Sequence, residues 1–213
     1  MTPIEIIDQA NQLRDEGRIR ESIDTANQLL TSDNPDVIIQ AYNCIGLAYL
    51  ELDEYDDTID TLKKALDIAQ NNNLTSHIEN LFRDISFGYS KKRDFDEALV
   101  WLQKSLAQTE INPDSDYDTI RNRAATKAVT LARIGLIYTW MDNINEAEKA
   151  FLESQELVKS STYQYWNISC NLYYAYFLAQ KKKNYELATH VLTLAIESAA
   201  ILNKPLKLAD LII

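Results

Sequence analysis

Two histidines and two cysteines are the residues of this 213-residue chain best suited to catalysis or metal binding. His77 and His190 lie more than 100 residues apart, and neither has a metal-ligand residue four positions further along its helix. Cys44 and Cys170 sit within apolar helical patterns, with no CxxC pair and no Cys/His cluster. We therefore expect ordinary helix histidines, reduced core thiols, and no bound metal.

Carboxylates are abundant, but they do not converge on one place in the sequence. Pairs such as Asp56-Asp57 are typical of solvated helix faces. Asp114, Asp116 and Asp118 have the spacing of a calcium loop, but the central glycine and the terminal glutamate are missing. The chain also has no phosphate-binding glycine loop and no nucleophile elbow. These observations predict a protein that is not an enzyme and needs no cofactor.

The charge balance points away from polyanionic partners. The chain has 32 Asp and Glu against 21 Lys and Arg, a net charge of −11. Such a chain is repelled by nucleic acid and by anionic membrane surfaces. No signal peptide is visible, and no uncharged apolar run reaches about 18 residues. We expect a cytoplasmic protein.

Helix signals dominate the sequence. Thr2, Pro3 and Glu5 form a capping box with proline in the first turn, and Asn34-Pro35 repeats the start signal. Apolar residues recur at helical spacing, and no segment alternates long enough for a strand. The sequence therefore predicts an all-α fold.

A polar turn followed by a small residue occurs five times. The small residues are Ser22, Thr58, Ala98, Ala147 and Ala188, at intervals of 36, 40, 49 and 41 residues. Twelve positions before them lie further small residues, namely Ala10, Gly46, Ser86 and Gly135, whereas Tyr176 breaks the rule. The helix around Tyr176 is rich in aromatic residues, which indicates either a large-for-small exchange in the core or an aromatic recognition patch.

These units resemble tetratricopeptide repeats. Tyr42–Tyr49, followed by Tyr55, Ala65 and Leu66, is the closest match, and Leu131, Ile134-Gly135, Tyr138, Ala147 and Phe151 the next. The resemblance implies a right-handed α-solenoid of about five helix–turn–helix units, each with a helix A and a helix B that meet through small residues. Units longer than the common 34 residues resemble those of bacterial signalling regulators.

The predicted organisation is a single domain over residues 1–213. The units span about residues 3–34, 35–73, 74–112, 119–160 and 161–203. We expect Glu110–Asp118 to be a solvated loop that accounts for the interval of 49 residues. Residues 204–213 would begin a sixth unit. Their apolar sequence predicts that the natural protein continues, or that a second copy covers this open end as a homodimer.

The resemblance implies a non-enzymatic module that binds a protein or an extended peptide on the concave face of the A helices. The predicted lining is Asn11, Asn43, Leu47, Asn80, Arg83, Phe87, Trp140, Tyr173 and Phe177. We expect Asn43, Arg83 and Tyr173 to form one row. Packing between repeats is an alternative role for Leu47, Phe87 and Phe177. Asp84 stands where a clamp for chaperone C-terminal tails needs a cation, so we exclude that activity.

A second interpretation places the chain in a larger protein. It would then be the sensory domain of a cyclase, a kinase or a transcription regulator, in which ligand binding changes the curvature of the solenoid. A catalytic or DNA-binding segment after Ile213 would distinguish this interpretation from a free-standing binding module.

Overall fold

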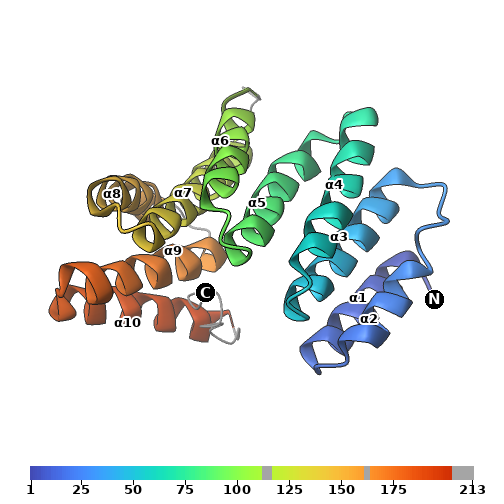
Figure 1. Cartoon of the computed structure of the whole chain (residues 1–213), viewed down its shortest axis with the longest axis horizontal. Coiled ribbons are helices and arrows are strands. Elements are labelled where there is room, and N and C mark those ends of the chain that lie inside the picture. Colours follow the sequence, from blue (N-terminus) through green and yellow to red (C-terminus); the bar gives the residue numbers. More distant parts are fainter. Residues whose placement is uncertain (112–116, 161–163, 203–213) are drawn as a thin grey trace. The chain divides into compact units, whose positions relative to one another are not determined.

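The computed structural model describes residues 1–111, 117–160 and 164–202, and the structural statements below concern these residues. They form helices joined by short turns, without a strand (Figure 1). The chain divides into two compact parts, each larger than one repeat, which are Met1–Ser105 and Leu106–Ile213. They are called the first unit and the second unit below. The acidic segment 112–116 and the predicted start of a sixth hairpin at 204–213 lie outside the described residues.

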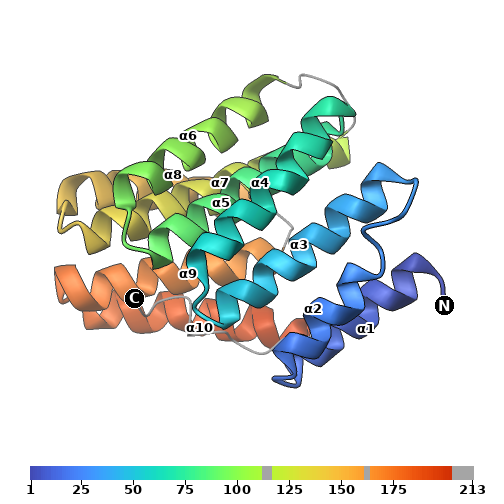
Figure 2. The same ribbon diagram turned by 45° about the vertical axis from the view of Figure 1, so that its right-hand side comes forward.

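Five helix hairpins follow one another along the chain and confirm the predicted all-α, helix–turn–helix fold. The A helices are α1 (Pro3–Asp15), α3 (Pro35–Glu51), α5 (Thr75–Lys91), α7 (Tyr117–Trp140) and α9 (Gln164–Phe177), which continues as the π-helical turn η1 (Leu178–Lys182). The B helices are α2 (Ile19–Asn27), α4 (Tyr55–Asn71), α6 (Phe95–Ile111), α8 (Ile144–Ser160) and α10 (Tyr185–Ile201). Figures 1 and 2 both show α9 and α10 side by side.

The first helix begins at the predicted capping box. The Thr2 hydroxyl accepts a hydrogen bond from the Glu5 amide at 3.3 Å, and the Glu5 carboxylate accepts one from the Thr2 amide at 2.7 Å. The Asn34 side chain likewise accepts from the Asp36 amide at 3.0 Å, just before Pro35. These side chains satisfy amides that have no partner inside their own helix.

Every turn between an A helix and its B helix has the same backbone shape. Two positions before each B helix lies a residue with positive φ, namely Gly17 (77°), Asp53 (58°), Arg93 (66°), Asp142 (60°) and Lys183 (54°). The next amide then bonds back to the A helix, as Glu54 N does to Tyr49 O at 3.0 Å. This closure is a Schellman-type end, so the repeat is present in the backbone even where the residue types differ.

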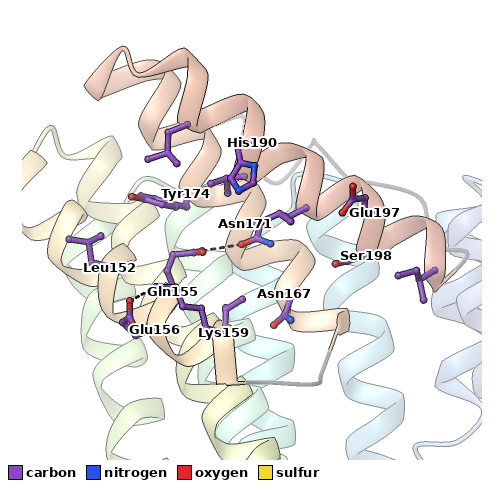
Figure 3. Close-up of a pocket in the computed structure, with 15 residues that line it drawn as sticks. Leu152, Gln155, Glu156, Lys159, Asn167, Asn171, Tyr174, His190, Glu197 and Ser198 are labelled. Carbon is purple, nitrogen blue, oxygen red and sulfur yellow. Dashed lines mark hydrogen bonds and ion pairs between the residues drawn. The ribbon is translucent and has the colours of Figure 1, made fainter.

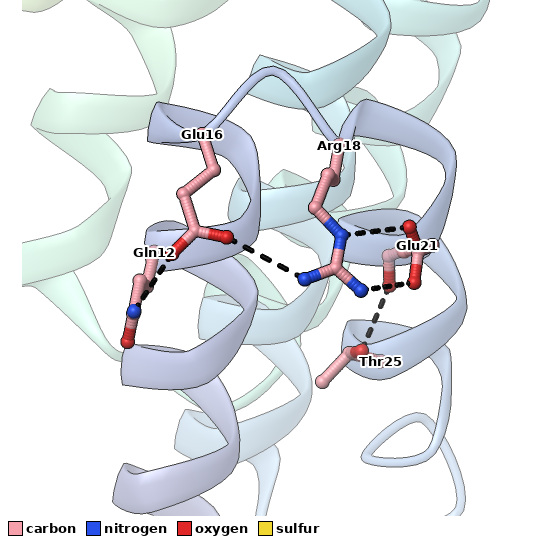
Figure 4. A network of polar contacts seen from close by, with 5 residues as sticks. All are labelled: Gln12, Glu16, Arg18, Glu21 and Thr25. Atoms are coloured by element: carbon pink, nitrogen blue, oxygen red, sulfur yellow. Dashed lines mark hydrogen bonds and ion pairs between the residues drawn. The ribbon is translucent and has the colours of Figure 1, made fainter.

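Side-chain contacts cover the first of these turns (Figure 4). The Arg18 guanidinium donates to both carboxylate oxygens of Glu21, at 2.8 and 2.6 Å, and reaches Glu16 at 3.5 Å. The Arg18–Glu21 hydrogen bond lowers the pKa of Glu21. Gln12 donates to Glu16 on the other side of the turn at 2.8 Å. Such exposed pairs add little stability, so burial between the helices must hold each hairpin together.

Small residues on the A helices let large residues on the B helices approach. A Cβ on Gly46 would lie 2.8 Å from the Leu62 side chain, and one on Gly135 would lie 2.9 Å from the Phe151 ring. Leu62 and Phe151 are completely buried. The predicted small-against-large crossing of the two helices is therefore confirmed in both hairpins. Gly88 makes a third close approach, to Ile59 on the preceding B helix at 2.9 Å.

The π-helical turn explains why Tyr176 breaks the repeat rule. In the fourth hairpin, Asn143 N bonds to Tyr138 O, whereas in the fifth Asn184 N reaches one residue further back, to Leu178 O at 3.0 Å. One extra residue is therefore inserted before the turn, as in other π-bulges. Counted with this insertion, Ala175 rather than Tyr176 takes the small-residue position, and Ala175 is buried. The assignment of Tyr176 to that position was wrong.

The predicted loop at Glu110–Asp118 is corrected at its two ends, while residues 112–116 lie outside the described part of the chain. Helix α6 continues to Ile111, and α7 already begins at Tyr117. Helix α7 has 24 residues, compared with 17 in α3 and α5, so the longer interval is largely taken up by helix. Composition could not separate the two cases, because exposed helix ends are as polar as loops.

We predict that Gly135→Leu overpacks the crossing with Phe151. The added side chain has no room, so the free energy of unfolding should fall by about 1–3 kcal/mol or more. Urea titration followed by circular dichroism would measure this. Gly17→Asn is the matched control, because no atom lies within 4 Å of a Cβ there and asparagine tolerates positive φ. Equal stability of Gly135→Leu and the wild type would contradict the proposed packing.

Candidate binding pocket

The second unit contains a pocket of about 500 Å³ between α8, α9 and α10. Figure 3 shows Leu152 and Gln155 on α8, Asn167, Asn171 and Tyr174 on α9, and His190 and Glu197 on α10. Leu187, Val191, Leu194, Ser198 and Ile201 complete the α10 wall. Helix α9 packs against α10, against α7 and, less closely, against α8. A volume of this size suits a small ligand or a few residues of a peptide.

The apolar wall of the pocket is not required by the repeat fold. Helices α4, α6, α8 and α10 each have 17 residues and can be aligned from their first residue. Leu194 then aligns with Lys64, Lys104 and Glu153. Leu187 aligns in the same way with three acidic residues, Asp57, Glu97 and Glu146. The last hairpin has thus replaced charged side chains by leucines, both of which are more than one third exposed.

A third exposed leucine lies on the opposite wall of the pocket. Leu152 on α8 is 52% exposed, and it aligns with Lys63 on α4 and Gln103 on α6. Large exposed apolar side chains on both walls are costly in water unless something covers them. The walls therefore favour a ligand with apolar groups.

The space in the pocket has an identifiable origin. Val191 aligns with Trp101, whose ring lies 5.8 Å from Phe82 and 6.5 Å from Tyr89 in the first unit. Valine is much smaller than tryptophan, so the corresponding groove of the second unit is only partly filled by its own side chains. The smaller residue leaves room without a change in helix length.

Polar groups on the α8 and α9 walls are mainly carboxamides. The Gln155 amide donates to Asn171 Oδ1 at 3.1 Å, and Asn171 is 4% exposed. The Asn167 Oδ1 atom is buried without a hydrogen-bond partner among the described residues. Glu156 accepts from Lys159 at 2.6 Å. Carboxamides both donate and accept, so they can satisfy the N–H and C=O groups of a peptide backbone.

The predicted A-helix residues of the first unit are in mixed surroundings. Asn11, Asn43, Leu47 and Phe87 are partly exposed, and Asn80 is exposed. Asn11 accepts from the Cys44 thiol at 3.7 Å, and the Lys91 ammonium lies 5.3 Å from the centre of the Phe87 ring. Arg83 is only 2% exposed. Its guanidinium donates to Asn80 and lies 3.8 Å from Glu79, so this arginine is held by its own helix.

The predicted residues of the second unit belong largely to the core. Tyr173 and Phe177 are buried in one cluster, against which Trp140 packs from outside, and Phe177 lies 5.2 Å from the Phe151 ring. The π-helical insertion moves the register of α9, so Leu172 rather than Tyr173 corresponds to Asn43 and Arg83. In the predicted row of Asn43, Arg83 and Tyr173, the third residue is therefore corrected, because Tyr173 lies one position away from the place that matches the other two.

Sequence reasoning missed the pocket because it considered only the A helices. The signal was present in α10, where Leu187 and Leu194 stand at positions that other B helices fill with charged residues. His190, interpreted from the sequence as an ordinary helix residue, lines this pocket. His77 instead forms a hydrogen bond with Asp36, with 2.5 Å between Nε2 and Oδ1, and so connects the starts of α5 and α3.

The described residues offer few groups for chemistry. No cluster of three His, Cys, Asp or Glu side chains among them could hold a metal ion. Both cysteines are buried, and burial raises the pKa of the Cys170 thiol to about 12 and also raises that of Cys44. A thiol in this state is a poor nucleophile at neutral pH. Within the same part of the chain, no helix has the length and apolar character needed to cross a membrane.

We predict that Cys170 resists alkylation in the folded protein. Its raised pKa should lower the thiolate fraction by about a thousandfold at mildly alkaline pH. Mass spectrometry after iodoacetamide treatment, with the chain in urea as the control, would measure the rate. The folded-state rate should keep rising as the pH approaches 12. Labelling as fast as in urea would contradict the burial.

Comparison with known proteins identifies the repeat. The tetratricopeptide repeat model matches residues 37–111. The crystal structure of NprR in complex with its cognate peptide NprX has a TM-score of 0.69 at 19% identity, over 93% of this chain and 57% of that one. BtubC from P. vanneervenii has a TM-score of 0.64 at 15% identity, over 91% and 78% of the two chains.

Aspartyl phosphate phosphatase F from Bacillus subtilis also has a TM-score of 0.64, at 13% identity over 97% of this chain and 62% of that chain. Comparison with curated protein sequences gives no match. At these identities the structural similarities establish the fold, which agrees with the repeat found in residues 37–111. Residues 37–111 thus carry tetratricopeptide repeats, and the described chain as a whole has the repeated helix–turn–helix fold of such proteins.

Proposed function

We propose that this chain is a binding module for a peptide segment of a partner protein, and that the pocket between α8, α9 and α10 receives apolar side chains of that segment. The observation that carries the proposal is the pair Leu187 and Leu194, exposed at positions where the other B helices have charged residues. The fold supports it, since stacked helix hairpins present long grooves to partners.

A peptide fits the pocket better than a purely apolar small molecule. Gln155, Asn167 and Asn171 line the same space as the leucines. A peptide supplies both apolar side chains and backbone groups that need hydrogen-bond partners, so it matches both parts of the lining. The relative NprR was crystallised with a peptide, which is consistent with peptide binding by this fold.

The proposal describes a non-enzymatic protein. The leucines and carboxamides that line the pocket suit recognition of a peptide, and this lining supports the proposed role. The partly exposed A-helix residues Asn11, Asn43, Leu47 and Phe87 belong to the first unit and offer a separate candidate contact surface. As a sensory domain of a longer signalling protein, the chain would use the same binding step.

We predict that Leu194→Lys abolishes most of the peptide affinity. Lysine occupies this position in α4 and α6, so the variant should fold, but it places a charge in the apolar wall. Loss of one buried leucine contact, about 1.5–3 kcal/mol, corresponds to an affinity at least tenfold lower. A peptide selected from a random displayed library on the wild-type chain would be titrated by calorimetry.

Val100→Lys is the matched control, because Val100 is an exposed apolar residue of α6 outside the pocket. It should leave the affinity unchanged. Equal affinities for wild type and Leu194→Lys, or equal losses in both variants, would refute the pocket as the binding site.

A further inference from the structure

The surface of the first unit that corresponds to the pocket in the repeat alignment has the opposite chemistry. Lys63 on α4 aligns with Leu152 on α8, and Lys104 on α6 aligns with Leu194 on α10. In the second unit these two positions supply the apolar walls on either side of α9. In the first unit they place two ammonium groups around α5. We call this surface, formed by Lys63, Tyr89, Trp101 and Lys104, the lysine surface.

The two lysines converge on one aromatic ring. The Lys63 ammonium donates to the Tyr89 hydroxyl at 2.9 Å and lies 5.7 Å from the centre of the Trp101 ring. The Lys104 ammonium lies 3.7 Å from the centre of the same ring. Trp101 is held in place by its contacts with Phe82 and Tyr89 on α5. Both cations are therefore positioned by a fixed aromatic surface.

The lysine surface is rich in hydrogen-bond donors and poor in acceptors. Each ammonium has three donors, and the indole nitrogen of Trp101 is a donor only. Among the described residues, neither lysine forms an ion pair with a carboxylate, and the Trp101 Nε1 atom is buried without a partner. In a chain with 32 acidic residues, two lysines without acidic partners leave an acceptor to be supplied from outside.

We propose that the lysine surface binds a carboxylate side chain in an acidic segment of a partner protein. One carboxylate can accept from both ammonium groups, and the methylene groups next to it can lie against the indole. The net charge of −11 repels an acidic segment over the rest of the surface, so the local pair of cations selects where it docks. This site is independent of the apolar pocket in the second unit.

A blocked oligoglutamate peptide is the probe for this site. It would be titrated into the full chain at low ionic strength while the indole N–H signal of Trp101, assigned with Trp101→Phe, is followed by nuclear magnetic resonance. We expect a saturable shift of this signal that weakens with added salt. Lys63→Gln and Lys104→Gln should each weaken binding by about fivefold, as for a partly exposed ion pair.

Lys64→Gln is the matched control, because it removes the same charge from the neighbouring residue of α4. It should leave the affinity unchanged, as should Leu194→Lys, which tests the other site. If Lys64→Gln weakens binding as much as Lys63→Gln, the attraction is unspecific and the proposal fails. If the Trp101 signal does not move, the lysines only cover the indole and the proposal fails as well.

Discussion

The close crossing of helix A and helix B is the contact on which the rest of the structure depends. Gly46 faces Leu62 and Gly135 faces Phe151, with no room for a Cβ between them. This contact determines how near the two helices lie and therefore where every other residue of the hairpin points. The left-handed residue in each turn then lets the chain reverse within a few residues. Neither requirement involves the outer surface of the B helix.

That freedom explains how corresponding surfaces of two hairpins can carry two chemistries. Lys63 and Lys104 in the first unit correspond to Leu152 and Leu194 in the second. In both units, however, a glycine of an A helix packs against a large apolar residue of a B helix. Trp101 packs against Phe82 and Tyr89, whereas the aligned and smaller Val191 lines a pocket of about 500 Å³. A repeat fold can thus change what it binds by surface substitution alone, because its stability comes from other positions.

The fifth hairpin shows how a single inserted residue is accommodated. The π-helical turn after Phe177 absorbs the extra residue, so the turn at Lys183 keeps the backbone shape of the other turns. Before the insertion, each position of the repeat is taken by the residue one place earlier in the sequence than the spacing of the other hairpins predicts. Ala175 therefore meets the B helix, while Tyr173 and Phe177 enter the core. The same turn geometry and the same crossing are preserved at the expense of one irregular helical turn.

The sequence by itself determined the helices, the five repeats and the crossings at Gly46 and Gly135, because these depend on local periodicity and on residue size at fixed spacing. It could not place Tyr173 and Phe177, since a π-helical insertion leaves no composition signal and changes every side-chain direction before it. Nor could it separate a loop from a polar helix end at residues 110, 111, 117 and 118. Only the tertiary structure showed that Leu152 on α8 and Leu194 on α10 share one pocket, because that proximity depends on how α9 packs between their helices and not on any spacing along the chain.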